Sequence, residues 1–412
     1  MSNTRINLDY AASTPLLPEV QAAIVAALAE AGNPSAVSQA GQRAKQRVEQ
    51  ARRHVAALIN AKPEEIYFTS CGTESNNWAL RGLFAANKRK ALLAEKNGDG
   101  SPVSGAGKAE NRPLVPHLII STIEHPSISL TAKRLELEGA RMTILPVDRE
   151  GFVSLSDLKA AMTPQTILVS LMLANGEVGT VQPVRELAAI AHEHGVIFHT
   201  DAIAAAGQIP IDVHELGVDA LSMSANQFGG PQGAAALFVR ENVRILPLLE
   251  GGGQEHGGRS GTESVAAIAG MGMAAEITKG ELPNRLSHMA RLRDHLKEGL
   301  SSRVEHVRFY GSWASRLPNN LHACIDGLSS ESLVLGLDQA GVTVGLGSAC
   351  NSKSMRPSAV LKAMGLNDEQ AKGALVFTLS AQTTEQEVDQ ALEIIPTVVE
   401  KLRRVTALTA RV

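Results

Sequence analysis

Aromatic side chains are scarce in this sequence: Phe, Trp and Tyr together make up only 3% of its 412 residues, although 44% of the chain is hydrophobic. The core therefore has to consist mainly of Ala, Val, Leu and Ile. Cysteines are also few. Cys71, Cys324 and Cys350 are spaced too irregularly for a disulfide framework or a self-contained zinc site, so any cysteine with a chemical role has to act singly.

Long apolar runs and strong charge are missing as well. No segment approaches 18 uninterrupted apolar residues, and residues 1–10 lack a positive region followed by an apolar stretch. The sequence therefore predicts a soluble, cytoplasmic protein with no membrane partner. The formal net charge is -3 and the basic residues are scattered, so we expect no nucleic-acid partner.

Short apolar runs alternate with longer helical patterns over the first 240 residues. Such runs, separated by helices like those predicted at 41–59 and 184–194, are typical of a parallel sheet in an α/β fold. The predicted strands are 66–69, 118–121, 167–171, 196–200, 220–224 and 234–239.

We predict two domains. The large one spans 15–260, and a smaller α+β domain combines 1–14 with 261–412, where a helical pattern over 285–296 is apparent. Within the large domain, residues 87–116 shift to Lys, Gly, Ser and Pro without an apolar period. That composition predicts a mobile surface insertion.

Two segments could contribute to a ligand site at the ends of predicted strands. Residues 66–76 read as a strand, a tight turn at Gly72 and a helix start at Thr73, which would present free N–H groups and a hydroxyl to an anion. A plain turn with Thr73 as a helix cap explains this segment equally well. Asp201 follows a buried strand, where it could hold a protonated ring nitrogen or simply cap a turn.

A histidine and a cysteine are further candidates. His125 also follows a strand, and it could stack on a ring, move protons near neutral pH, or be purely structural. Cys350 lies in the small, polar run 345–354, where an exposed thiol could be a nucleophile, a sulfur carrier or an incidental surface group. We interpret Cys71 and Cys324 as small packing residues.

Taken together and in order, these segments resemble the cysteine desulfurase family, within the class V aminotransferase group of fold-type-I pyridoxal-phosphate enzymes. The resemblance covers nearly the whole chain apart from the predicted insertion. It implies a large domain with a mainly parallel seven-stranded sheet and a smaller α+β C-terminal domain. The matching segments are Leu-Asp-Tyr-Ala-Ala-Ser-Thr-Pro at 8–15, Gly-Asn-Pro-Ser at 32–35, Gly-Gly-Gly-Gln-Glu at 251–255, Arg-Ser-Gly-Thr at 259–262 and Thr-Thr-Glu at 383–385.

The resemblance also implies a homodimer that uses pyridoxal phosphate to take sulfur from free cysteine, leaving alanine and a persulfide on a loop cysteine. By similarity, Cys350 is that cysteine and His125 faces the cofactor ring. Asn175 faces the phenolic oxygen of the ring and Asp201 its nitrogen. The phosphate would be bound by Gly72, Thr73 and Ser224, with Thr262 from the partner subunit.

Departures from the family pattern concentrate in the reactive half of this site. Gln227 stands where the family has its Schiff-base lysine, and an amide nitrogen cannot form that bond because it is delocalised into its carbonyl. Ala381 replaces the arginine that binds the substrate carboxylate, which removes both charge and orientation. Three further positions depart: Asn226 replaces a His, Ala204 a Gln, and Gly176 the second Asn of Asn-Asn-Glu-x-Gly.

The sequence therefore predicts a cofactor pocket without the family's chemistry, and three functions stay open. The protein could be a degenerate homologue that acts as a binding or assembly partner. Alternatively, Cys350 could carry sulfur or handle metal or iron–sulfur clusters together with an assembly protein. The third is an enzyme that uses pyridoxal or pyridoxamine phosphate held without a covalent bond.

Overall fold

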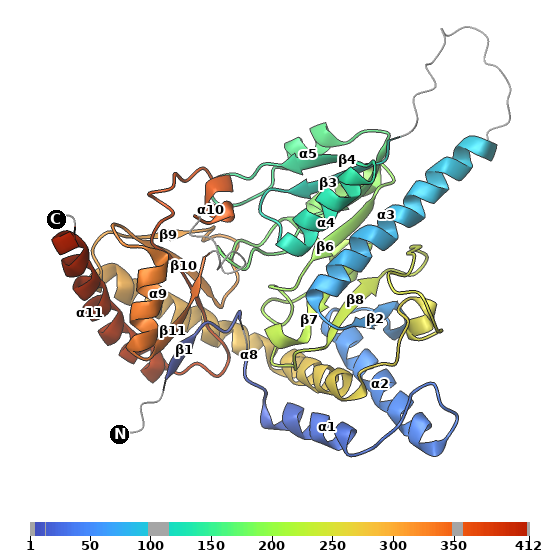
Figure 1. The fold of residues 1–412 in the computed structure, drawn as a ribbon, viewed down its shortest axis with the longest axis horizontal. Helices are drawn as coiled ribbons and strands as arrows, with labels where there is room; N and C mark the ends of the chain where they lie inside the picture. The colour runs from blue at the N-terminus through green and yellow to red at the C-terminus, as the bar shows by residue number, and fades with distance from the viewer. Residues whose placement is uncertain (1–4, 13, 98–114, 348–356, 410–412) are drawn as a thin grey trace, which may run out of the picture.

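The computed structural model describes residues 5–12, 14–97, 115–347 and 357–409, and the side chains of 89–97 and 406–409 are not described. Its larger sheet has seven strands in the order β2-β8-β7-β6-β5-β3-β4. Every pairing from β7 to β4 is parallel, whereas β8 runs antiparallel to both neighbours. The predicted mainly parallel, seven-stranded sheet is thus confirmed (Figure 1). Its strands are β2 (Ile66–Thr69), β3 (His117–Ser121), β4 (Arg141–Leu145), β5 (Thr166–Ser170), β6 (Ile197–Asp201), β7 (Ala220–Ser224) and β8 (Ala235–Val239).

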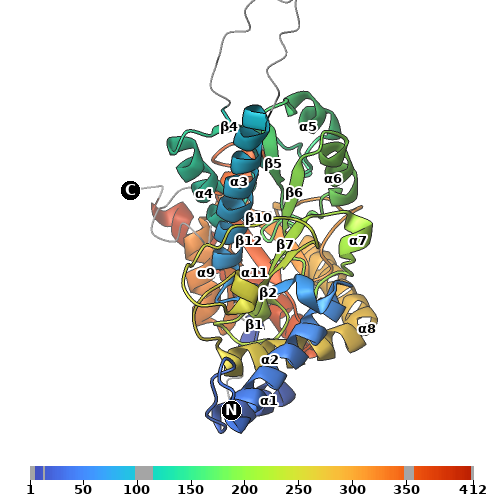
Figure 2. The same cartoon turned by 90° about the vertical axis from the view of Figure 1, so that its right-hand side faces the viewer.

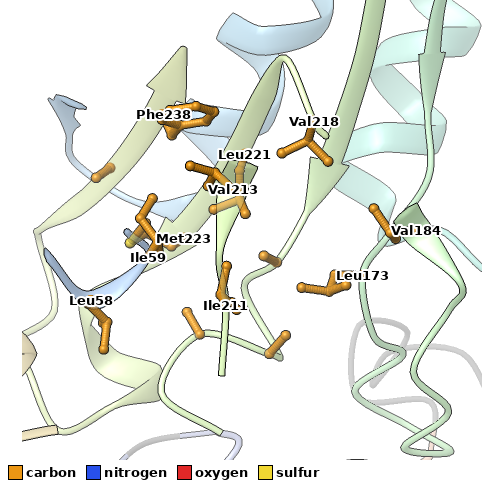
Figure 3. Close-up of a cluster of buried hydrophobic side chains, with 14 of the residues drawn as sticks. Leu58, Ile59, Leu173, Val184, Ile211, Val213, Val218, Leu221, Met223 and Phe238 are labelled. Carbon is orange, nitrogen blue, oxygen red and sulfur yellow. The ribbon is translucent and has the colours of Figure 1, made fainter. Parts of the chain in front are cut away.

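Helices cover both faces of this sheet, which explains why its central strands are apolar throughout. On one face, α3 and α4 pack over Leu118, Leu168 and Leu237. On the other, α1, α2, α5, α6, α7 and the first part of α8 enclose a larger core, and Figure 3 shows Leu221, Met223 and Phe238 within it. The bounds are α1 (Pro18–Leu28), α2 (Gln39–Leu58), α3 (Gly72–Asn97), α4 (Pro126–Leu137), α5 (Leu155–Ala161), α6 (Val184–Glu193), α7 (Val213–Leu216) and α8 (Val265–Arg303).

A second sheet has five strands in the order β1-β11-β12-β10-β9. It buries its own core with the second part of α8 and with α9 and α11. Helix α8 thus joins the two cores, as Figures 1 and 2 show, and the helical pattern predicted over 285–296 is its second part. The remaining elements are β1 (Ile6–Leu8), β9 (Val307–Tyr310), β10 (Asn320–Ile325), β11 (Val342–Leu346), β12 (Ala374–Thr378), α9 (Ser330–Gln339), α10 (Ala359–Ala363) and α11 (Glu385–Thr409).

The structure differs from the sequence-based prediction in the segment after residue 87 and at strand β4. Residues 87–97 continue α3, so the first part of the segment predicted as an insertion is helical, and 98–114 lie outside the described residues. Strand β4 was not predicted, because its side chains are mostly exposed or half-buried and form no apolar run. The domain boundary near residue 260 stays a prediction. Among the described helices, none is long and apolar enough to cross a membrane.

Candidate functional site

The candidate site lies where β3, β5, β6 and β7 end and α3 begins, the edge at which open α/β sheets form ligand sites. Asn76 on α3 connects its parts: the Nδ2 group donates to Asp201 Oδ2 over 2.7 Å and to Ser127 Oγ over 2.8 Å. Ser127 Oγ in turn lies 2.7 Å from His125 Nδ1. The structure therefore brings Asp201, His125 and the start of α3 together.

His125 is placed by the start of α4. It is the N-cap residue, with extended backbone and Pro126 at the first helical position, and its Nδ1 accepts the N–H of Ser127 over 3.1 Å. Proline suits that position because its φ is already helical and its missing N–H would have had no partner within the helix. The cap fixes the imidazole beside the end of β3, close enough to Asp201 to favour the charged carboxylate.

Asp201 is the last residue of β6 and is 5% exposed. Besides Asn76, its carboxylate accepts the backbone N–H of Ile203 over 2.9 Å. Burial raises the pKa of Asp201, since few neutral donors replace the water that a carboxylate loses. A cationic group beside Asp201 would stabilise the carboxylate, which is what a protonated ring nitrogen supplies.

Sequence reasoning missed a second buried acid next to His125. Glu124 Oε1 accepts from Ser121 Oγ over 2.6 Å and from the N–H of Met172 over 3.1 Å. Its Oε2 has no hydrogen-bond partner among the described residues. Burial, with a smaller contribution from Asp201, raises the pKa of Glu124 to about 8. The only sequence signal was its position beside His125.

The start of α3 forms a tight cradle. A Cβ on Gly72 would lie 2.3 Å from Ile203 Cδ1, so any larger residue there would have to displace the Ile203 side chain. The first N–H groups of the helix have no partners within it. Thr73 is exposed at this helix start. Ser224 ends β7 close by, but its hydroxyl donates to Asn226 Oδ1 over 2.6 Å. The substituted Asn226 thus engages a hydroxyl that family resemblance assigns to phosphate.

Gln227 ends a short 3₁₀ turn, Ala225–Gln227, directly after β7. Its side-chain Nε2 donates to the backbone carbonyl of Ala11 over 3.0 Å. The backbone carbonyl of Gln227 accepts from Gln208 Nε2 over 2.8 Å. The side chain therefore ties the N-terminal segment to the large sheet. A carboxamide in this arrangement can orient neighbours but is neither a base nor a nucleophile.

Two other substituted positions, Gly176 and Ala204, are neighbours in the structure. A Cβ on Gly176 would lie 3.5 Å from the Cβ of Ala204, so the two shortened side chains face each other. Next to them, Asn175 Nδ2 donates to the carbonyl of Ile123 over 3.2 Å, and its Oδ1 accepts the N–H groups of Glu177 and Val178. Asn175 is fully engaged as a turn-forming residue.

The remaining predicted site residues lie in separate parts of the chain. Ala381 and Gln227 line the same small cavity, of about 40 Å³. Thr262 is exposed at the start of the segment leading into α8. Cys350 lies outside the described residues. Of the two cysteines interpreted as packing residues, Cys324 is buried, and burial raises its pKa to about 12, whereas Cys71 is exposed and that interpretation was wrong.

The fold is that of the fold-type-I pyridoxal-phosphate-dependent enzymes. The chain belongs to the aminotransferase class-V family, whose pattern matches residues 6–100 and 115–391, and within it to the cysteine desulfurases. It is 40% identical over 409 residues to cysteine desulfurase IscS of Clostridium botulinum (strain Kyoto / Type A2), covering 98% of this chain and 97% of that protein. To cysteine desulfurase IscS of Dictyoglomus turgidum it is 42% identical over 402 residues, covering 97% and 96%.

Solved structures agree with this placement. A NifS-like protein superposes with a TM-score of 0.85 at 32% identity, covering 97% of this chain and all of that one. A structure described as SspA in complex with cysteine gives a TM-score of 0.75 at 29% identity, covering 92% and 99%. Residues 101–114, unmatched by the family pattern, lie within the segment predicted as an insertion.

The described residues fit pyridoxal phosphate at its ring and phosphate but not at its covalent anchor. Asp201 is a buried carboxylate suited to a ring nitrogen, and the cradle at Gly72 suits an anion. Asn76 Oδ1 and Glu124 Oε2 are buried without hydrogen-bond partners among the described residues, as expected where a polar ligand would complete the network. At position 227, however, no amine is available, and the sequence has no lysine between Lys159 and Lys279.

Proposed function

We propose that this protein is a cysteine-desulfurase-like chain that does not carry out pyridoxal-phosphate-dependent desulfuration of cysteine and acts instead as a binding or assembly partner. The proposal rests on one observation: Gln227 occupies the position of the family's lysine after β7, and its side chain is hydrogen-bonded to the carbonyl of Ala11. The lysine it replaces would both anchor the cofactor and move the substrate proton. An amide can do neither.

The other departures support the same conclusion because they affect different tasks. Ala381 removes the arginine that the family resemblance assigns to the substrate carboxylate. Ala204 and Gly176 replace polar side chains of the family beside Asn175, and Asn226 engages the Ser224 hydroxyl. One substitution could be a local adjustment, whereas losses in anchoring, substrate binding and ring contacts remove the reaction as a whole. The scaffold persists because fold and chemistry are separable.

A second candidate function is an enzyme, or a ligand-responsive partner, that holds pyridoxal or pyridoxamine phosphate without a covalent bond. The geometry of Asp201 favours it, because this buried carboxylate has only neutral hydrogen-bond donors among the described residues. Bound cofactor would supply a cation beside Asp201 and an acceptor for the α3 N-terminus. The residues of this chain would then hold the group by its ring nitrogen and phosphate alone.

We also propose a homodimer. Support comes from the Arg-Ser-Gly-Thr segment at 259–262, which resembles the family's contact across the subunit interface. Thr262 is exposed, as such a contact requires, and Arg259 Nε donates to Glu74 Oε1 over 2.8 Å, which fixes this segment beside the start of α3. Sulfur-transfer or iron–sulfur assembly partners stay a proposal that depends on Cys350.

Sulfide release from L-cysteine tests the main proposal. The purified protein, supplied with pyridoxal phosphate and with dithiothreitol to reduce any persulfide to sulfide, should release no more sulfide than free cofactor does under the same conditions. An active cysteine desulfurase assayed in parallel shows that the assay works. Turnover that depends on the protein and saturates with cysteine would overturn the proposal.

A further inference from the structure

Ala11 is hydrogen-bonded to both halves of the molecule. Its N–H donates to Thr378 Oγ1 over 2.8 Å, and its carbonyl accepts from Gln227 Nε2 over 3.0 Å. Thr378 is the last residue of β12 in the small sheet, whereas Gln227 lies in the turn directly after β7 of the large sheet. A single residue of the N-terminal segment therefore bridges the two sheets beside the candidate site.

The residues around Ala11 follow the small sheet. The N–H of Tyr10 donates to the carbonyl of Thr378 over 3.3 Å, and the N–H of Ala12 donates to the carbonyl of Asp9 over 3.3 Å. Asp9 and Thr378 also pair as an isolated parallel bridge. We call residues 9–12 the N-terminal strap. Because β1 belongs to the small sheet and α1 packs on the core of the large one, the chain crosses from one to the other at the strap (Figure 1).

Gln227 is fixed in place by hydrogen bonds to the backbone of its turn. The carbonyl of Gln227 accepts from Gln208 Nε2 over 2.8 Å, and the next carbonyl, that of Phe228, accepts from Thr278 Oγ1 over 3.2 Å. Gln208 and Thr278 are both buried. The strap, by contrast, includes an exposed residue at position 12 and a half-buried one at position 11. If the two parts separate, the strap is therefore the part that moves.

The strap forms one wall of the small cavity beside position 227. Tyr10 lines this cavity together with Gln227 and with Ala381, which follows β12. The cavity, of about 40 Å³, is only a little larger than the roughly 30 Å³ that one water takes up in the liquid. With the strap in this position, the space between Gln227 and Ala381 admits a water but no larger ligand group.

We propose that the N-terminal strap is an autoinhibitory element. Gln227 and Thr378 hold it across the space beside position 227, and a pyridoxal-type phosphate whose ring substituent points toward this position binds only when the strap opens. The inference rests on the proposed function, because the bond to Ala11 uses the amide that stands in place of the family's lysine. Since binding requires the open strap, the apparent affinity falls in proportion to the fraction of molecules that are open.

Hydrogen–deuterium exchange tests whether Gln227 holds the strap. Gln227→Met keeps the length of the side chain and removes its hydrogen-bond donor, so the open fraction should rise about two- to tenfold, as expected for one neutral hydrogen bond. The amides of Tyr10 and Ala11 should exchange faster by the same factor, although they are bonded to Thr378 and not to Gln227. Gln382→Met is the matched control, because Gln382 is exposed at the rim of the same cavity, and it should leave this exchange unchanged.

Calorimetric titration of the cofactor-free protein with pyridoxamine phosphate tests the consequence for binding. This compound has no aldehyde, so it forms no covalent bond with lysines. Gln227→Met and Thr378→Val should both bind it about two- to tenfold more tightly than the wild-type protein does. Thr378→Val is the more selective variant, because Thr378 does not line the cavity and acts on it through Ala11. Circular dichroism establishes that each variant is folded.

Two results would overturn the inference. One is exchange at residues 10 and 11 that Gln227→Met leaves unchanged. The other is binding of pyridoxamine phosphate that Thr378→Val does not strengthen, including the case in which neither protein binds it, because any effect of Gln227→Met would then be a direct contact. Either result leaves the proposed function standing, since that depends on sulfide release from cysteine. Conversely, sulfide turnover would refute the proposed function whatever exchange and calorimetry show.

Discussion

Glu124→Gln should make the free energy of unfolding less dependent on pH. Glu124 is buried beside the ends of β3 and β5, and burial raises its pKa from 4.5 to about 8. The folded protein therefore binds this proton more tightly than the unfolded chain does. Stability contributed by the neutral acid is present below about pH 4.5 and is lost as pH rises to about 8.

The magnitude follows from the same two values. At about 1.4 kcal/mol for each pKa unit, the wild-type protein loses at most about 5 kcal/mol across that interval, and relaxation around the charge would reduce the loss. Glutamine can keep the contacts with Ser121 and Met172 while carrying no charge. We therefore expect the two proteins to be similarly stable near pH 5 and the variant to be more stable near pH 9.

Urea denaturation at several pH values measures this difference directly. Because other buried groups titrate in both proteins, only the difference between wild type and variant is informative. Glu136→Gln on α4 is the matched control, since it removes an exposed carboxylate by the same substitution. A difference between wild type and Glu124→Gln that does not vary with pH would show that Glu124 is not held neutral by burial.

Three further predictions follow from the site. Gln227→Lys should restore the absorption band of covalently held pyridoxal phosphate but little desulfuration, because Ala381 and Ala204 remain. Turnover like that of the family from this one change would refute the claim that catalytic residues have been lost at several positions. Analytical ultracentrifugation at micromolar concentrations should show a homodimer, whereas sedimentation at the monomer mass would count against it. Cys350 should react with a bulky alkylating reagent faster than buried Cys324, with exposed Cys71 as the positive control, and a persulfide donor should add one sulfur that Cys350→Ser abolishes. Slow labelling of Cys350, or no sulfur uptake, would weaken the carrier hypothesis.

The central strands could be predicted because both faces of the sheet are covered. Continuous apolar runs mark such strands, and 220–224 coincides with β7. Strand β4 at the sheet edge carries exposed Arg141 and half-buried Thr143, so it has no such run. The antiparallel direction of β8 was also invisible, because burial pattern does not encode strand direction. Helix α3 extends into the predicted insertion, where local composition gave no helical period.

The site was predictable in its positions but not in its contacts. Motif order and family resemblance led to His125, Asp201 and Gln227. The sequence held no sign that Asn76 connects Asp201 to Ser127, or that Glu124 Oε2 is buried without a hydrogen-bond partner in the part of the chain that the structure describes. Arg285 is distant in sequence from both Gln227 and Ala381, and only the packing of α8 between the two sheets brings it to their cavity.

Covalent trapping at position 227 tests the central claim most directly. The protein is incubated with pyridoxal phosphate and reduced with borohydride, and peptide mass mapping then locates any cofactor bound to the chain. The peptide that contains residue 227 should carry no added mass in the wild-type protein and should carry cofactor in Gln227→Lys. Cofactor attached to one specific lysine of the wild-type protein in stoichiometric amount, together with sulfide release from cysteine, would contradict the account.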